Sequence, residues 1–155
     1  DDAARAAALG VVAVGNFAMS AVLLQRFAPE AARYLPTWEV IDFAADSKVD
    51  APSGTARELT WRLAQVAAPE TRVPIGETVG VPQTRGATLN RTQVHSVRLP
   101  GYTIGVEVRF GKPGERLTLA YEGGTEADPY VAGTLLAIRK VMGFRGLTRG
   151  LDPLL

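Results

Sequence analysis

The run Lys48-Val49-Asp50-Ala51-Pro52-Ser53-Gly54-Thr55-Ala56 separates a largely apolar segment, residues 38–45, from an amphipathic one, residues 55–67. This order predicts a strand, a loop with a lone lysine, and a helix. Ser53 is a typical N-cap residue, and Pro52 favours a turn before it. The first amides of a helix lack intrahelical partners and carry partial positive charge, so an anion can bind there. We therefore expect a small carboxylate to be held by Lys48, Ser53, Gly54 and Thr55.

The same run resembles the signature of the dihydrodipicolinate reductase family, which reads Glu-x-His-His-x-x-Lys-x-Asp-Ala-Pro-Ser-Gly-Thr-Ala. From Lys48 to Ala56 every defined position matches. Upstream, Asp42 stands where the family has glutamate, and Ala44 and Ala45 stand where it has two histidines. In the family the first histidine is held to be the proton donor and the second contacts the substrate. The resemblance thus implies the family fold, with its catalytic histidine pair replaced by alanine.

The resemblance also implies roles for other residues. It gives an NAD(P)H-dependent oxidoreductase that acts on a small cyclic or imino carboxylate, with Lys48 as catalytic and substrate-binding residue. Asn16 and Phe17 match family residues near the nicotinamide of NADPH or NADH. The family arginine that faces the substrate before the last helix corresponds to Ala127. Asp42 and Asp46 are alternative proton donors, whereas a mid-strand histidine such as His95 is more often structural.

Hydrophobic periodicity predicts an α+β fold, with a mixed, mostly antiparallel sheet and helices on one face. Residues 10–14 suit a buried strand, and residues 17–35 a helix that Pro29 kinks or splits. Residues 69–87 suit a long loop. Strands over 88–99, 102–110 and 116–122 form an antiparallel meander in this interpretation, with one wet face formed by Glu107, Arg109, Arg116 and Thr118.

The end of the chain is expected to hold one helix and an irregular tail. Asp128 and Pro129 are typical of a helix start. A stripe spaced at three to four residues predicts the buried face of this helix: Val131, Leu135, Ile138 and Met142. From Gly143 no periodicity remains.

Three segments follow from the resemblance. Residues 1–16 end a nucleotide-binding Rossmann domain, residues 17–143 form a substrate-binding and oligomerisation domain, and residues 144–155 are a C-terminal tail. The sequence lacks a Gly-x-Gly-x-x-Gly motif, so we expect the chain to be the C-terminal portion of a longer protein, the short strand and the tail belonging to the missing domain. The family packs four copies sheet to sheet, which implies a homotetramer.

Composition excludes several classes of protein. The 155 residues are 46% hydrophobic and 21% charged, with a net charge of +1, so neither nucleic acid nor a membrane is an expected partner. With no cysteine and one histidine, no metal site is expected. A cytoplasmic location is the default expectation. Two alternatives stay open: a catalytically inactive relative serving as a binding or assembly module, and a dehydrogenase of another amino or imino acid.

Overall fold

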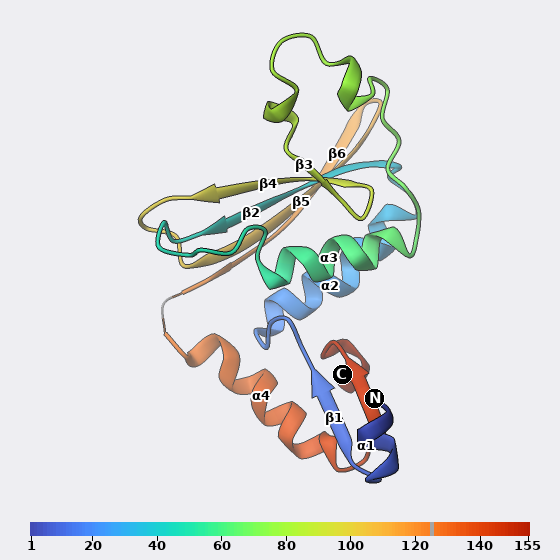
Figure 1. Cartoon of the computed structure of the whole chain (residues 1–155), viewed down its shortest axis with the longest axis vertical. Helices are drawn as coiled ribbons and strands as arrows, with labels where there is room; N and C mark the ends of the chain where they lie inside the picture. The colour runs from blue at the N-terminus through green and yellow to red at the C-terminus, as the bar shows by residue number, and fades with distance from the viewer. Residues whose placement is uncertain (125) are drawn as a thin grey trace.

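The computed structural model describes residues 1–124 and 126–155. It contains a larger and a smaller sheet with helices packed against them (Figure 1). The elements, in chain order, are α1 (Asp2–Ala6), β1 (Gly10–Ala13), α2 (Met19–Ala32), β2 (Thr37–Ala44), α3 (Gly54–Ala64), η1 (Ile75–Glu77), η2 (Pro82–Arg85), β3 (Ala87–Leu89), β4 (Thr92–Arg98), β5 (Ile104–Lys112), β6 (Glu115–Gly123), α4 (Asp128–Val141), β7 (Gly146–Arg149) and η3 (Asp152–Leu154).

The larger sheet has the strand order β3-β4-β2-β5-β6. Strand β2 pairs parallel with β4 and antiparallel with β5. The expected meander is therefore wrong, because β2 lies between the two strands that were expected to be neighbours. The reason is that β2, α3 and β4 form a βαβ unit, in which the helix returns the chain for a parallel pairing. The other edge of β2 is then free for β5.

Helices α2 and α3 cover one face of this sheet (Figure 1). The core between them is built from buried residues on both layers, including Trp38, Val40, Leu59, Val108 and Phe110. The mixed sheet with helices on one face is thus confirmed. Helix α2 continues through Pro29, so of the two expected effects, a kink or a split, the split is wrong. Pro29 lies in the last turn, where the buried residues Ala28 and Ala32 hold the helix against the core.

The opposite face of the sheet is the wet one, as expected. The side chains of Arg109, Arg116 and Thr118 are exposed there, while alternate residues of β5 are buried. The strand expected over residues 88–99 is divided into β3 and β4 by a turn at Asn90 and Arg91, whose φ angles are 48° and 68°. We call this wet face of the five-stranded sheet the outer face.

The smaller sheet pairs β1 with β7 in parallel, from Gly10 opposite Gly146 to Ala13 opposite Arg149. The expectation of an irregular tail is therefore wrong. Four residues of β7 are too few to show a period, and the pairing joins chain segments more than a hundred residues apart. The assignment of residues 1–16 and 144–155 to a nucleotide-binding domain stays a prediction.

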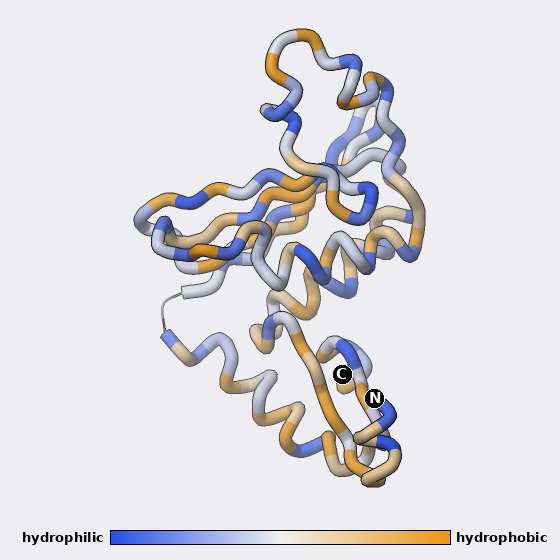
Figure 2. The backbone as a smooth tube through the Cα atoms, viewed as in Figure 1, coloured by the Kyte–Doolittle hydropathy of each residue, from blue (hydrophilic) through white to orange (hydrophobic). Residues whose placement is uncertain are grey.

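Helix α4 packs against β1 through small residues. Gly133 and Ala137 are its buried residues, and a Cβ on Gly133 would lie 2.0 Å from the Phe17 carbonyl oxygen. The stripe predicted as buried is instead 43–77% exposed, and Figure 2 shows hydrophobic residues along this helix. Small residues face the sheet because they permit close approach of the backbones. The first helical residue is Asp128, and Ala127 is the N-cap.

Within residues 1–124 and 126–155, none of the helices combines the length and the apolar character needed to cross a bilayer.

Candidate functional site

The start of α3 has the predicted capped geometry. The Ser53 hydroxyl oxygen accepts a hydrogen bond from the Ala56 amide at 3.3 Å, and Arg57 N–H donates to the Ser53 carbonyl at 2.9 Å. In the described part of the chain, no acceptor contacts the amides of Gly54 or Thr55. A Cβ added at Gly54 would meet no atom within 4 Å. The first turn of α3 is therefore open to a ligand at Gly54.

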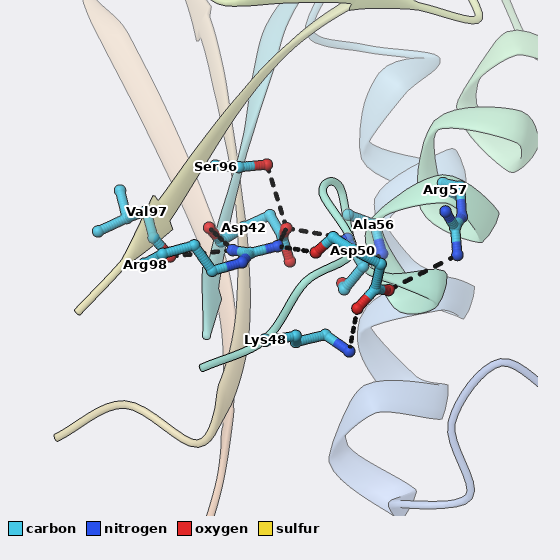
Figure 3. Close-up of polar contacts among 9 residues, drawn as sticks. Asp42, Lys48, Asp50, Ala56, Arg57, Ser96, Val97 and Arg98 are labelled. Carbon is cyan, nitrogen blue, oxygen red and sulfur yellow. Dashed lines mark hydrogen bonds and ion pairs between the residues drawn. The ribbon is translucent and has the colours of Figure 1, made fainter. Parts of the chain in front are cut away.

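Lys48 lies beside this turn but is paired with Asp50. The distance from Lys48 Nζ to Asp50 Oδ1 is 2.6 Å, and Arg57 Nη2 lies 3.7 Å from the other carboxylate oxygen (Figure 3). The hydrogen bond from Lys48 lowers the pKa of the Asp50 carboxyl. An anion at the start of α3 would therefore compete with Asp50 for the Lys48 ammonium.

Asp42 is buried and paired with Arg98. Its side chain has 0% exposure, and Arg98 Nη2 donates to Asp42 Oδ2 at 2.7 Å. The same oxygen accepts hydrogen bonds from Ser53 N–H at 2.9 Å and from the Ser96 hydroxyl at 3.2 Å (Figure 3). This geometry makes Asp42 an acceptor inside the protein rather than a donor facing a ligand. Asp46, the other candidate acid, is exposed.

Sequence reasoning missed Arg98. No local pattern marks it, because the pairing joins positions 42 and 98 across two parallel strands. The replaced histidine positions also differ in surroundings: Ala44 is fully buried at 0% exposure, and Ala45 is half-buried. Neither alanine has an ionisable side chain, so neither position can supply a proton.

Asn16 and Phe17, the two residues expected near the cofactor, make contacts within the chain. Asn16 Nδ2 lies 3.3 Å from Thr55 Oγ1 and 3.4 Å from the Tyr121 hydroxyl, while Asn16 Oδ1 accepts from Ala18 N–H. Phe17 packs against the core of the smaller sheet. Burial raises the pKa of the Tyr121 phenol. Asn16 thus connects the turn after β1 to the start of α3, which the sequence could not show.

His95 lies away from Lys48, on the outer face. Its Nε2 is 2.8 Å from Glu39 Oε2, and Arg85 Nη2 is 2.8 Å from Glu39 Oε1. Burial alone would raise the pKa of Glu39, but hydrogen bonds from Arg85 and His95 outweigh it and lower that pKa. Ala127 is exposed at the N-cap of α4 and makes no side-chain cap.

Two cavities border the site without enclosing it. A cavity of about 790 Å³ lies between the end of β1 and α3, where Gly15, Arg57 and Trp61 line it. A second, of about 630 Å³, is lined by Pro52 and His95 among others. Neither is lined by Lys48, Gly54, Thr55 or Ala44.

The chain is similar in sequence to a known protein family. A family model described as dihydrodipicolinate reductase, C-terminus, matches residues 20–154. The 4-hydroxy-tetrahydrodipicolinate reductase of Moorella thermoacetica is 43% identical over 95% of this chain and 54% of its own length. That of Mycolicibacterium smegmatis is 40% identical over 94% and 59%, respectively. The chain therefore spans little more than half the length of these relatives.

Among solved structures, a dipicolinate-bound dihydrodipicolinate reductase from Paenisporosarcina sp. TG-14 is similar to this chain. The TM-score is 0.83 with 34% sequence identity, and the match covers 98% of this chain and 57% of that one. The structural match therefore extends over both sheets. The residues matched by the family model include the loop after β2 and the start of α3.

Proposed function

The chain belongs to the dihydrodipicolinate reductase C-terminus family, and from this premise we propose that it forms the carboxylate-binding part of an NAD(P)H-dependent reductase. The substrate class is a small cyclic or imino carboxylate. One observation carries the proposal: the first turn of α3 is open at Gly54 and lies beside Lys48 (Figure 3), and among the described residues the amides of Gly54 and Thr55 have no acceptor. A carboxylate there would take charge-assisted hydrogen bonds from Lys48 and the amides of Gly54 and Thr55.

We propose that Asn16 and Phe17 lie near the nicotinamide, as the family resemblance implies. The side-chain amide of Asn16 is used by Thr55, Tyr121 and Ala18, and Phe17 packs into a core. NADPH or NADH remains the proposed hydride donor of a protein of the relatives' length, because those relatives are named as reductases. For the chain itself we propose carboxylate binding and orientation, and no step at the nicotinamide.

A second candidate is favoured by the alanines at the histidine positions. Ala44 and Ala45 are unable to move a proton, Asp42 is buried against Arg98, and Asp46 is an exposed carboxylate on the loop. The protein would then be an inactive relative that binds a carboxylate and serves as a binding or assembly module. Measurement of turnover separates this candidate from a slow reductase.

Dipicolinate is the probe that tests the proposed binding, because the similar solved structure is described as bound to it. We expect isothermal titration calorimetry to show one dipicolinate site per chain. Lys48→Gln should weaken binding about tenfold or more, because a hydrogen bond to a charged group is worth roughly 1.5–3 kcal/mol. Lys112→Gln is the matched control, since Lys112 also pairs with a carboxylate at 2.6 Å, on the β5–β6 hairpin.

The control should bind dipicolinate like the wild type. Equal loss of affinity in both variants, or no binding by a folded wild-type chain at millimolar dipicolinate, would remove the proposed site.

We also propose that copies of the chain assemble through the outer face into a homotetramer. The half-buried side chains of Ile41, Phe43 and Val97 lie on this face, among exposed charges such as Arg109. A face of this kind can pair with itself by symmetry. At micromolar concentration, light scattering should give an oligomer for the wild type and a smaller species for Ile41→Asp. A monomeric wild type would contradict this proposal.

A further inference from the structure

The half-buried guanidinium of Arg98 joins the sheet to the loop that carries Lys48. Its Nη2 donates to Asp42 Oδ2 at 2.7 Å and to the Asp50 carbonyl at 2.8 Å. Its Nη1 donates to the Val97 carbonyl at 2.9 Å and to the Asp42 carbonyl at 3.3 Å. The Arg98 side chain is 16% exposed. One guanidinium therefore fixes the ends of β2 and β4 and, at the same time, the backbone at Asp50 (Figure 3).

The carboxylate of Asp42 supplies a second fixed point on the same loop. Its Oδ2 accepts from Ser53 N–H at 2.9 Å, in addition to Arg98 and Ser96. Among the residues that the structure describes, Asp42 Oδ1 and Arg98 Nε have no hydrogen-bond partner. The described residues thus make all their hydrogen bonds to this carboxylate through one oxygen, which Arg98, Ser96 and the Ser53 amide share.

The two contacts hold the loop at Asp50 and at Ser53, and the geometry of the carboxylate site depends on both residues. Asp50, which pairs with Lys48, is held through its carbonyl, and Ser53, which caps α3, is held through its amide. Only Ala51 and Pro52 lie between them. The position of the Lys48–Asp50 pair and the direction of the first α3 amides are therefore both set by the Arg98–Asp42 pair.

We propose that Arg98 is a positioning residue for the carboxylate site, acting through Asp42, Asp50 and Ser53 without touching the ligand. The identity of the ligand rests on the proposed function, whereas the effect on the loop does not. Arginine is required because its planar fork donates from separate nitrogens to acceptors that a single lysine ammonium cannot reach together.

The test compares Arg98→Lys with the wild-type 155-residue chain by two measurements. The first is the hydrogen exchange rate of the Ser53 amide, followed by NMR, with β5 amides as the internal reference for global stability. The second is dipicolinate affinity by calorimetry. We expect exchange at Ser53 to accelerate about tenfold or more, affinity to fall about tenfold, and β5 exchange to stay near the wild-type rate.

Ser96→Ala is the matched control, because Ser96 donates to the same oxygen of Asp42 and, among the described residues, its side chain makes no hydrogen bond to the loop. It should leave both measurements within about twofold of wild type. In Arg98→Ala, millimolar guanidinium should restore part of the lost affinity, whereas methylammonium should not, because it lacks the planar fork.

Wild-type exchange at Ser53 and wild-type affinity in Arg98→Lys would overturn the proposal. Equal acceleration at Ser53 and in β5 would also overturn it, because Arg98 would then only stabilise the fold. If the wild type binds no dipicolinate but Ser53 alone exchanges faster in Arg98→Lys, positioning of the loop is supported and the proposed function fails.

Discussion

A chimera in which this chain replaces the matching part of the Moorella thermoacetica relative is expected to reduce the relative's substrate about 10²–10⁴-fold more slowly. This range is the usual contribution of a positioned general acid. The family resemblance places the proton-donating histidine at Ala44, which is fully buried and has no ionisable group. Asp42 is held by Arg98, and Lys48 is held by Asp50. Steady-state turnover with NADPH and NADH measures the effect.

The unmodified relative is the control for the chimera, and dipicolinate binding shows that the exchanged part is folded. Turnover equal to that of the relative would contradict the loss of the donor, and Lys48 would become the first residue to test as the proton source. Complete absence of turnover together with dipicolinate binding would favour the inactive relative over the slow reductase.

Asp42→Ala is expected to lower the free energy of unfolding by about 3 kcal/mol. Removal of one partner of a buried ion pair leaves the other charge uncompensated, at a cost of roughly 3–5 kcal/mol. We expect the lower end of this energy range, because the Arg98 side chain is 16% exposed and still donates hydrogen bonds to the Val97 and Asp50 carbonyls. The variant also leaves Ser53 N–H without its acceptor. Urea denaturation followed by circular dichroism gives the change.

Asp46→Ala is the control, since Asp46 is an exposed aspartate on the same loop. A change within about 0.5 kcal/mol is expected there, as is usual for surface positions. Comparable destabilisation by both substitutions, or a loss below about 1 kcal/mol for Asp42→Ala, would mean that the buried pair does not hold this part of the fold.

The sequence predicted the strand, loop and capped helix around the signature because each of these signals is local. Ser53, Gly54 and Thr55 follow one another, and their capping geometry depends on little else. The apolar alternation of β5 likewise located its buried and exposed faces. These are the features that short-range sterics and periodicity determine.

Features that depend on distant partners could not be predicted in this way. The position of β2 between β4 and β5 depends on the βαβ unit as a whole, and the Asp42–Arg98 pair joins residues 56 positions apart. Helix α4 was assigned the wrong buried face, because apolar periodicity marks a stripe but not what covers it. The helix instead packs through its small residues, because the backbone at Gly133 lies close to the Phe17 carbonyl.

The central claim is that the open first turn of α3 and Lys48 together bind a carboxylate. A crystal structure of the chain with dipicolinate tests it most directly. We predict one carboxylate of the ligand within hydrogen-bond distance of the Gly54 and Thr55 amides, with Lys48 Nζ moved from Asp50 to the ligand. Dipicolinate bound elsewhere, or bound at this turn with the Lys48–Asp50 pair still at 2.6 Å, would contradict the account.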